Sequence, residues 1–458
     1  MFAIPGIAAL IVFIFVRPQE AFPILQKVPF LHLFTALAVL GYIIDVRLRR
    51  LQPIGCPTLA WILGFILWAI MCEAAIVPDH LIGKTIELLI LFALYGTIAH
   101  GIQRFRTFQT VAAAVCMTML FIIGVCVIQG LSDKQCIGGE EADGEMLGSP
   151  DGRICEMNEQ CRIGAPDPSL EYRCEHVGPL DTFSVQERVR YRGDLQDPNE
   201  VSLATAAGGF AILIAFGIRK RGLTRLLSII GAFVVVVGIV MTQSRGGLIG
   251  AMLVPGAFLV RKYGVKVIIP ALCVAVPVMM FGARSGADAD QSTEMRYEAW
   301  ATGLDMFKHS PIFGVGPGQF GQHNYLTAHN SFVLTLGEMG MIGMFLFVCL
   351  LWLTVKCLVV GLRQLKDVPG SEVAQTWAMA LLAAMCGIIF QINTLSFAYH
   401  PVLWLFFGLV GGWCSAVRHH LPGFHVKLVS RDLAIIGGLC VVYTFVVLPV
   451  FLKLKGIT

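Results

Sequence analysis

Long, unbroken apolar segments dominate this 458-residue chain, and they constrain its fold more than any other feature. Only 14% of the residues are charged, against roughly 25% in a soluble protein, so lipid must be the solvent for most of the exterior. In a bilayer the backbone must satisfy its own hydrogen bonds, which leaves helices or closed barrels, and unbroken apolar runs exclude the alternating strands of a barrel. We therefore predict an all-α polytopic membrane protein with about 12–13 transmembrane helices. The thirteen candidate segments lie near 2–16, 29–46, 57–77, 81–99, 108–128, 199–217, 226–242, 246–260, 265–282, 340–360, 372–391, 400–417 and 432–452.

Lysine and arginine collect in every second loop between these segments, which predicts the orientation. Positive residues stay on the cytoplasmic side, so the N-terminus should be cytoplasmic and, with thirteen spans, the C-terminus outside. The two long polar segments, 129–198 and 283–339, then both lie outside. They divide the chain into five N-terminal helices (1–128), an acidic loop (129–198), helices six to nine (199–282), a second loop (283–339) and helices ten to thirteen (340–458).

The first outer loop holds half of the chain's 30 acidic residues, so it should be a small, water-facing module. It also contains four cysteines. An even number in an oxidising compartment predicts two disulfides, in one of three pairings, although free thiols are the alternative. Zinc is not favoured, because these cysteines include no C-x-x-C pair. The four are Cys136, Cys155, Cys161 and Cys174.

A glycine-rich motif with one arginine, Thr242-Gln-Ser-Arg-Gly-Gly-Leu-Ile-Gly250, lies at an outer junction of two spans. Gly246 and Gly247 allow a sharp turn and a close approach by a partner. Arg245 could bind a phosphate with two parallel hydrogen bonds. The alternative is an arginine that extends to the membrane interface without a further role.

A second motif begins at Met295-Arg-Tyr-Glu-Ala-Trp300 and predicts a helix that ends in the Gly/Pro-rich stretch 309–318. Arg296 and Trp300 are i, i+4 and share one face of that helix. Trp300 could be only an interface anchor, and Arg296 an ordinary exposed arginine.

In a third motif, His329 leads directly into an apolar helix that Asn330 or Ser331 can cap. A helix N-terminus attracts anions, and a histidine there can act as a general base near neutral pH. A purely structural histidine is the alternative. Further upstream, Asp197-Pro-Asn-Glu200 follows Arg192 and opens a span. Asp197 could bind substrate there, or Asp197 or Asn199 could simply cap the helix. We see no convincing metal-ligand spacing and expect no metal and no cofactor.

These motifs resemble the O-antigen ligase superfamily, which includes O-antigen polymerases and bacterial O-oligosaccharyltransferases. The pattern His-Asn, nine residues, Gly, two residues, Gly is met by His329, Asn330, Gly340 and Gly343, and the Ser244–Gly246 motif and the Arg296 helix are similar to other parts of the family pattern. The likeness is strongest over about 190–345. The cysteine-bearing acidic loop and the thirteenth span depart from the pattern, which leaves the member and its acceptor open.

The resemblance implies a GT-C-like membrane glycosyltransferase in the inner membrane of a bacterium, with its active site on the periplasmic face. The donor would be a glycan on undecaprenyl pyrophosphate, and the acceptor a hydroxyl of lipid A-core, another glycan or a protein; no nucleic-acid partner is expected. In that reaction His329 would be the base, Arg245 and Arg296 would stabilise the leaving pyrophosphate, and Arg192, Asp197, Asn330 and Ser244 would contact substrate.

Two other functions remain as alternatives. A polymerase would use the same donor with a lipid-borne glycan as acceptor, and the sequence does not separate it from a ligase. A flippase or transporter is a more distant alternative, because we find no inverted repeat and few charges within the spans. Among those charges, Lys84 and Glu87 are i, i+3 and could neutralise each other.

Overall fold

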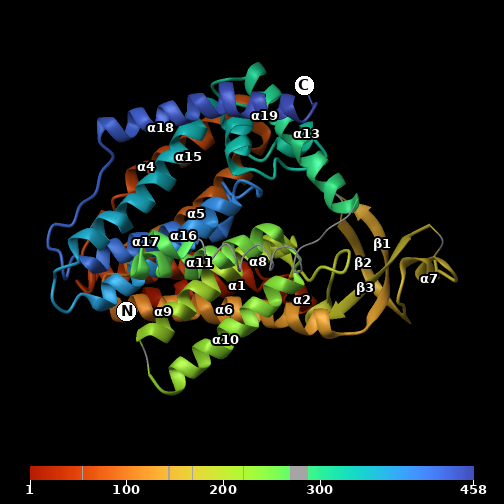
Figure 1. The fold of residues 1–458 in the computed structure, drawn as a ribbon, viewed down its shortest axis with the longest axis horizontal. Helices are drawn as coiled ribbons and strands as arrows, with labels where there is room; N and C mark the ends of the chain where they lie inside the picture. The colour runs from red at the N-terminus through yellow and green to blue at the C-terminus, as the bar shows by residue number, and fades with distance from the viewer. Residues whose placement is uncertain (54, 143–144, 168, 220, 269–286, 458) are drawn as a thin grey trace. The chain divides into compact units, whose positions relative to one another are not determined.

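The computed structural model describes residues 1–53, 55–142, 145–167, 169–219, 221–268 and 287–457. The chain forms two compact units. The first comprises Met1–Leu10, Phe30–Ala114 and Ser285–Thr458, and the second comprises Ile11–Pro29 and Val115–Arg284. Each unit is described below by itself (Figure 1).

Nine helices in the described part of the chain are long and apolar enough to cross a membrane, and α1 (Ala3–Phe15) and α17 (Pro401–Val417) are shorter apolar helices. This confirms a polytopic helical membrane protein. Of the thirteen predicted segments, 265–282 lies outside the described residues from position 269 onward, and each of the others coincides with a helix. The segment at 246–260 coincides with α11 (Arg245–Tyr263), which is not among the nine.

The first unit is built mainly from long helices, with α17 at its centre. Nearly every residue of α17 is buried, so this helix is surrounded by protein. Gly408, Gly411 and Gly412 let its backbone approach α5, where added methyl groups would meet Ile98 and Ala99. The other helices of this unit are α3 (Phe30–Arg47), α4 (Leu59–Ile76), α5 (Leu81–Gly101), α13 (Ala287–His309), α14 (Phe320–His323), α15 (Ser331–Gln364), α16 (Glu372–Gln391), α18 (Ser430–Val442), the π-helical turn η7 (Tyr443–Val447) and α19 (Leu448–Leu454).

The second unit combines helices with a small sheet. A π-helical turn, η5 (Ala206–Phe210), joins α8 (Pro198–Thr205) to α9 (Ala211–Arg219). Next comes α10 (Leu223–Met241), which a three-residue turn connects to α11. Helix α6 (Phe105–Leu131) begins in the first unit and supplies most of its length to the second.

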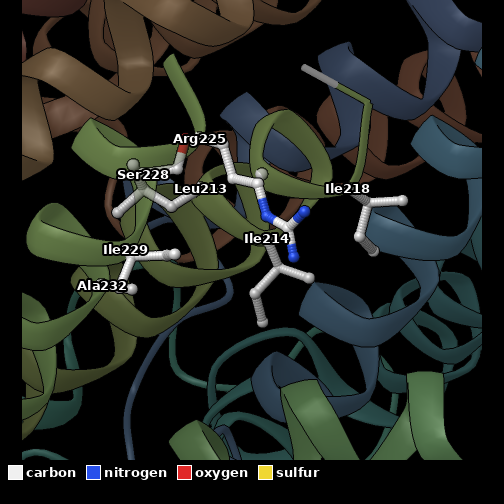
Figure 2. A pocket seen from close by; sticks show the side chains of 8 residues that line it. Leu213, Ile214, Ile218, Arg225, Ser228, Ile229 and Ala232 are labelled. Carbon is white, nitrogen blue, oxygen red and sulfur yellow. The ribbon is translucent and has the colours of Figure 1, made fainter. Parts of the chain in front are cut away.

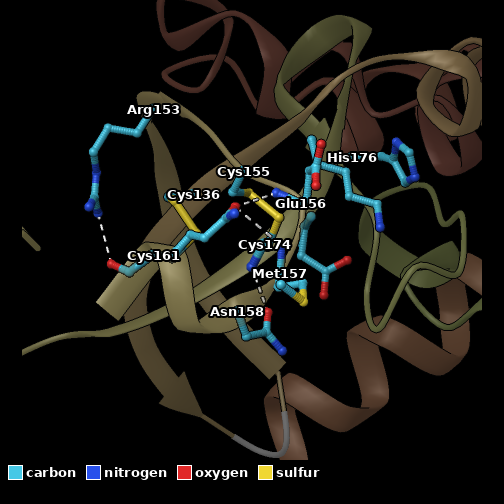
Figure 3. Close-up of a disulfide and its surroundings, with 12 residues drawn as sticks. Cys136, Arg153, Cys155, Glu156, Met157, Asn158, Cys161, Cys174 and His176 are labelled. Carbon is cyan, nitrogen blue, oxygen red and sulfur yellow. Dashed lines mark hydrogen bonds between the residues drawn. A yellow bond between two sulfur atoms is a disulfide. The ribbon is translucent and has the colours of Figure 1, made fainter. Parts of the chain in front are cut away.

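The acidic loop folds into a four-stranded antiparallel sheet of order β2-β1-β3-β4, which the sequence analysis did not predict. Two disulfides stabilise this module (Figure 3). Cys136–Cys161 joins β1 to the short helix that follows β2, and Cys155–Cys174 joins the residue directly after β2 to β3. Together with Tyr172, the cysteines form a small buried core. The elements are β1 (Lys134–Ala142), β2 (Glu145–Ile154), α7 (Asn158–Arg162), β3 (Glu171–Gly178) and β4 (Thr182–Phe183).

Candidate functional site

In the second unit, the turn between α10 and α11 presents the candidate arginine. Gln243 adopts a left-handed backbone conformation with φ of 50°, which reverses the chain. Ser244 then caps α11: its Oγ accepts a hydrogen bond from the Gly247 amide at 3.0 Å. Arg245 is therefore the first residue of the helix, and its side chain is exposed.

The N-terminus of α8 is connected to the same turn. Asp197 caps α8 and accepts hydrogen bonds from the backbone and side-chain nitrogens of Asn199, at 2.7 and 2.8 Å. Oδ1 of Asn199 in turn accepts a hydrogen bond from Ser244 Oγ at 2.7 Å. Gly247 permits this closeness, because a methyl group in its place would collide with the Ser202 side chain. Asp197 and Ser244, two predicted substrate contacts, thus each cap a helix within one hydrogen-bond network.

Arg188 is a member of this network that the sequence analysis missed. Asn199, the alternative cap, instead accepts the hydrogen bond from Ser244, and Asp197 is the cap. Arg188 donates from Nε to the Thr242 carbonyl at 2.9 Å and from Nη2 to Asn199 Oδ1 at 3.1 Å. The guanidinium therefore fixes the end of α10 against the start of α8. The sequence feature that could have indicated Arg188 is the arginine at every second position, 188, 190 and 192.

Arg192 is half-buried, and its guanidinium carbon lies 6.0 Å from the Tyr191 ring centroid. Its Nε has no hydrogen-bond partner within the residues that the structure describes. A neighbouring arginine, Arg190, instead donates to the Phe183 carbonyl at 3.1 Å. The Nε of Arg192 therefore has a donor that the described residues do not use.

In the first unit, the candidate base lies immediately before α15. Asn330 is the N-cap, and its side-chain oxygen accepts hydrogen bonds from the amides of Phe332 and Val333 at 3.0 and 3.2 Å. Its Nδ2 donates to the Tyr443 hydroxyl at 3.2 Å. His329 is half-buried and has a left-handed backbone, with φ of 43°. Such a conformation is uncommon outside glycine and is often found at functional sites.

A kink in α15 explains one glycine of the motif. Helix α15 starts at Ser331 rather than near 340, and it is interrupted at Gly340, whose φ of 65° and ψ of −167° suit only glycine. The stretch after α13 packs into this kink: the Met341 amide donates to the Pro311 carbonyl, and the Gly316 amide to the Glu338 carbonyl, both at 3.0 Å. The Met339 carbonyl that the kink frees accepts from the Trp68 indole at 3.0 Å.

Arg296 and Trp300 both lie on α13, which ends at His309 as predicted, and both are half-buried. The Trp300 ring packs against Phe451 of α19, with 5.5 Å between centroids, and against Tyr297 at 5.6 Å. Lys455 lies 5.5 Å from the Tyr297 centroid. These contacts favour the interpretation of Trp300 as a packing residue of an aromatic cluster.

A buried polar group lies beneath the glycine-rich stretch of the same unit. Oε1 of the buried Glu338 accepts from the Phe320 amide at 3.1 Å. Burial, together with the nearby Glu338 carboxylate, raises the pKa of the Tyr399 hydroxyl well above its usual range.

Lys84 pairs with Glu87 at 2.7 Å, so the predicted neutralisation of these two charges is confirmed.

The structure divides the predicted residues between the two units: Arg192, Asp197, Ser244 and Arg245 in the second, and Arg296, His329 and Asn330 in the first. A pocket of about 450 Å³ between α9 and α10 contains none of them (Figure 2). Its walls are mostly apolar, with Arg225 as the one charged side chain among the lining residues, so it offers little for the predicted chemistry.

Comparison with known proteins bears on the part of the chain that carries these motifs. No curated protein matches the sequence. Residues 201–348, about a third of the chain, match the family model described as O-antigen ligase, and Arg245, Arg296 and His329 all lie within the match. For that part of the chain, the match confirms the resemblance to the O-antigen ligase superfamily and supports a ligase- or polymerase-like function in general.

Proposed function

We propose that this protein is a ligase-like glycosyltransferase that moves a glycan from undecaprenyl pyrophosphate to an acceptor hydroxyl. The acceptor would be lipid A-core or a related surface glycan, and the reaction would take place at the periplasmic face of a bacterial inner membrane. The family match over residues 201–348 supports the class of reaction. The distribution of lysine and arginine among the loops supports the orientation.

The observation that carries the proposal is the backbone of His329. A left-handed histidine directly before a capping asparagine is strained by about 1–3 kcal/mol, and such strain persists where the surroundings hold it. In the proposed reaction the imidazole takes the proton of the acceptor hydroxyl. The hydroxyl oxygen bonds to the anomeric carbon, and the bond from that carbon to the pyrophosphate oxygen breaks, with its electron pair leaving on the pyrophosphate.

Arg245 and Arg296 are proposed to stabilise the charge that develops on the leaving pyrophosphate. Arg245 suits this role because it begins a helix whose first amides also favour anions. Arg192, with its free Nε, is proposed as a further contact to the donor. These guanidinium groups supply positive charge at the leaving group, so the proposal includes no metal.

Asp197, Ser244 and Asn330 were predicted to contact substrate, and we now propose an indirect role for them. Ser244 caps α11 beside Arg245, and Asn330 caps α15 beside His329. Asp197 caps α8 and is linked to Ser244 through Asn199. They would hold Arg245 and His329 in place for the substrate.

The test uses two substitutions of His329 that separate chemistry from backbone strain. Asparagine tolerates the left-handed region and alanine does not, so His329→Asn keeps the local fold while it removes the base. Transfer from a purified lipid-pyrophosphate-linked glycan should fall about 10²–10⁴-fold in both variants, while the Tm should fall only in His329→Ala. If His329→Asn transferred glycan at more than about a tenth of the wild-type rate, His329 would not be the base.

A gene deletion separates the ligase from the polymerase. Loss of attached glycan with the lipid-linked chain retained is expected for a ligase. Loss of long chains with a single repeat unit still attached would instead identify a polymerase, which uses the same donor.

A further inference from the structure

A strongly basic pocket lies in the first unit, apart from the residues discussed above. Its volume is about 330 Å³. No acidic residue is among those that line it, and the other polar side chains are two glutamines and a serine. The basic lining residues are Arg49, Arg50, Arg104, Arg418 and His419.

Met1 and three further parts of the chain form this pocket: the segment after α3, the connection from α5 to α6, and the end of α17. Paired hydrogen bonds hold the segment after α3 to the α5–α6 connection. Gln103 Nε2 donates to the Gln52 carbonyl at 2.5 Å, and the Gln52 amide donates to Gln103 Oε1 at 3.1 Å. Arg418 fixes the third, donating from Nη2 to the Gly55 carbonyl at 3.0 Å. The walls are therefore built by specific contacts.

The four arginines have no anionic partner in the residues that the structure describes. None of them forms an ion pair there, although Lys84, Lys134 and Lys356 all do. Arg50 instead lies 5.0 Å from the centroid of the Phe2 ring. Four like charges around one pocket repel each other, and a bound anion would relieve this repulsion. All four are arginine, whose planar fork matches the oxygens of a phosphate.

Helix α3 places an exposed apolar surface next to this pocket, which the binding of a free anion would not require. A stripe of large apolar side chains runs along it at helical spacing, and each is between 43% and 55% exposed. The last of them directly precedes Arg49, so the stripe leads to the pocket. Its members are Leu33, Leu37, Leu40, Ile44 and Leu48.

We propose that this pocket binds the phosphate group of an anionic phospholipid, with an acyl chain of that lipid along the α3 stripe. The basic loops predict that this end of the unit is cytoplasmic, and the cytoplasmic leaflet is the one whose negative lipids attract such residues. The positive-inside rule accounts for arginines in these loops but not for their convergence on one pocket. The inference does not depend on the proposed reaction.

The test is native mass spectrometry of the purified protein with phosphatidylglycerol or phosphatidylcholine added. Wild-type protein should retain phosphatidylglycerol in preference to phosphatidylcholine. Arg104→Gln should weaken retention about fivefold, the change that about 1 kcal/mol per basic residue implies. Arg106→Gln is the matched control, because it removes the same charge two residues further on, in the first turn of α6, but does not line the pocket. It should retain the lipid as the wild type does.

Three results would overturn the proposal. Equal retention of the two lipids would mean that the phosphate charge is not recognised. Equal loss in both variants would mean that the overall positive charge of this region, and not the pocket, attracts the lipid. Displacement of phosphatidylglycerol by inorganic phosphate, with phosphate bound just as well on its own, would mean that the pocket is a free-anion site.

Discussion

Gly340→Ala offers the sharpest test of how α15 is built. The φ of 65° and ψ of −167° at this position suit only glycine, so alanine would add about 1–3 kcal/mol of backbone strain. The new methyl group would also meet the carbonyl oxygens of Pro311 and Ile312. These are backbone atoms and cannot rotate away, as the far end of a flexible side chain could. We expect a total loss of at least about 3 kcal/mol in the free energy of unfolding.

The measurement is the Tm of the purified protein in detergent, with Gly96→Ala as the control. Gly96 lies within α5, and no atom stands within 4 Å of where its methyl group would be, so alanine there should be neutral or slightly stabilising. Gly340→Ala should melt well below the wild type and lose glycan transfer. If the two variants melted at the same temperature, the kink would not be fixed by the backbone, and the explanation of this motif glycine would be wrong.

Three further predictions concern the second unit. Arg188→Gln should raise the KM for the lipid-linked donor with a smaller effect on kcat, because it releases Thr242 and Asn199 without removing a reacting group; an unchanged KM would contradict this. Cys155→Ser should destabilise the outer module by about 2–5 kcal/mol, which limited proteolysis of the loop would detect as faster cleavage. A hydrogen bond from Lys134 lowers the pKa of Glu187 below its ordinary 4.5. The stability that this carboxylate adds should therefore be present above about pH 4.5 and be lost as the pH falls below that value. Limited proteolysis of the loop across pH 3–6 would check this.

The membrane helices could be predicted from the sequence because their signal is local. Each apolar run specifies a helix by itself, since the bilayer leaves few alternatives. The helix caps were also visible, because a capping side chain acts on amides two or three residues away. Thus Asn330 could be proposed as a cap without knowledge of any distant residue, and the structure shows it bonded to the amides of Phe332 and Val333.

The sheet of the outer module could not be predicted, because its strands lack the alternating apolar pattern. Strand β1 contains Gly138 and Gly139, which read as loop residues. Its stability comes from partners far along the chain: the Tyr172 ring of β3 covers Gly138, and Cys136 is bonded to Cys161. Arg188 was missed for the same reason, because its partners Thr242 and Asn199 are near it only in the folded protein.

Two of the three candidate catalytic residues, Arg245 and His329, have one arrangement in common, although they lie in different units. In each, the capping residue is the direct neighbour of the candidate: Ser244 precedes Arg245, and Asn330 follows His329. A cation in the first turn of a helix is disfavoured by about 0.3–1 kcal/mol, because the helix dipole and the unpaired amides there favour negative charge. An anion bound at the start of α11 would interact favourably with both the Arg245 guanidinium and the first amides of the helix.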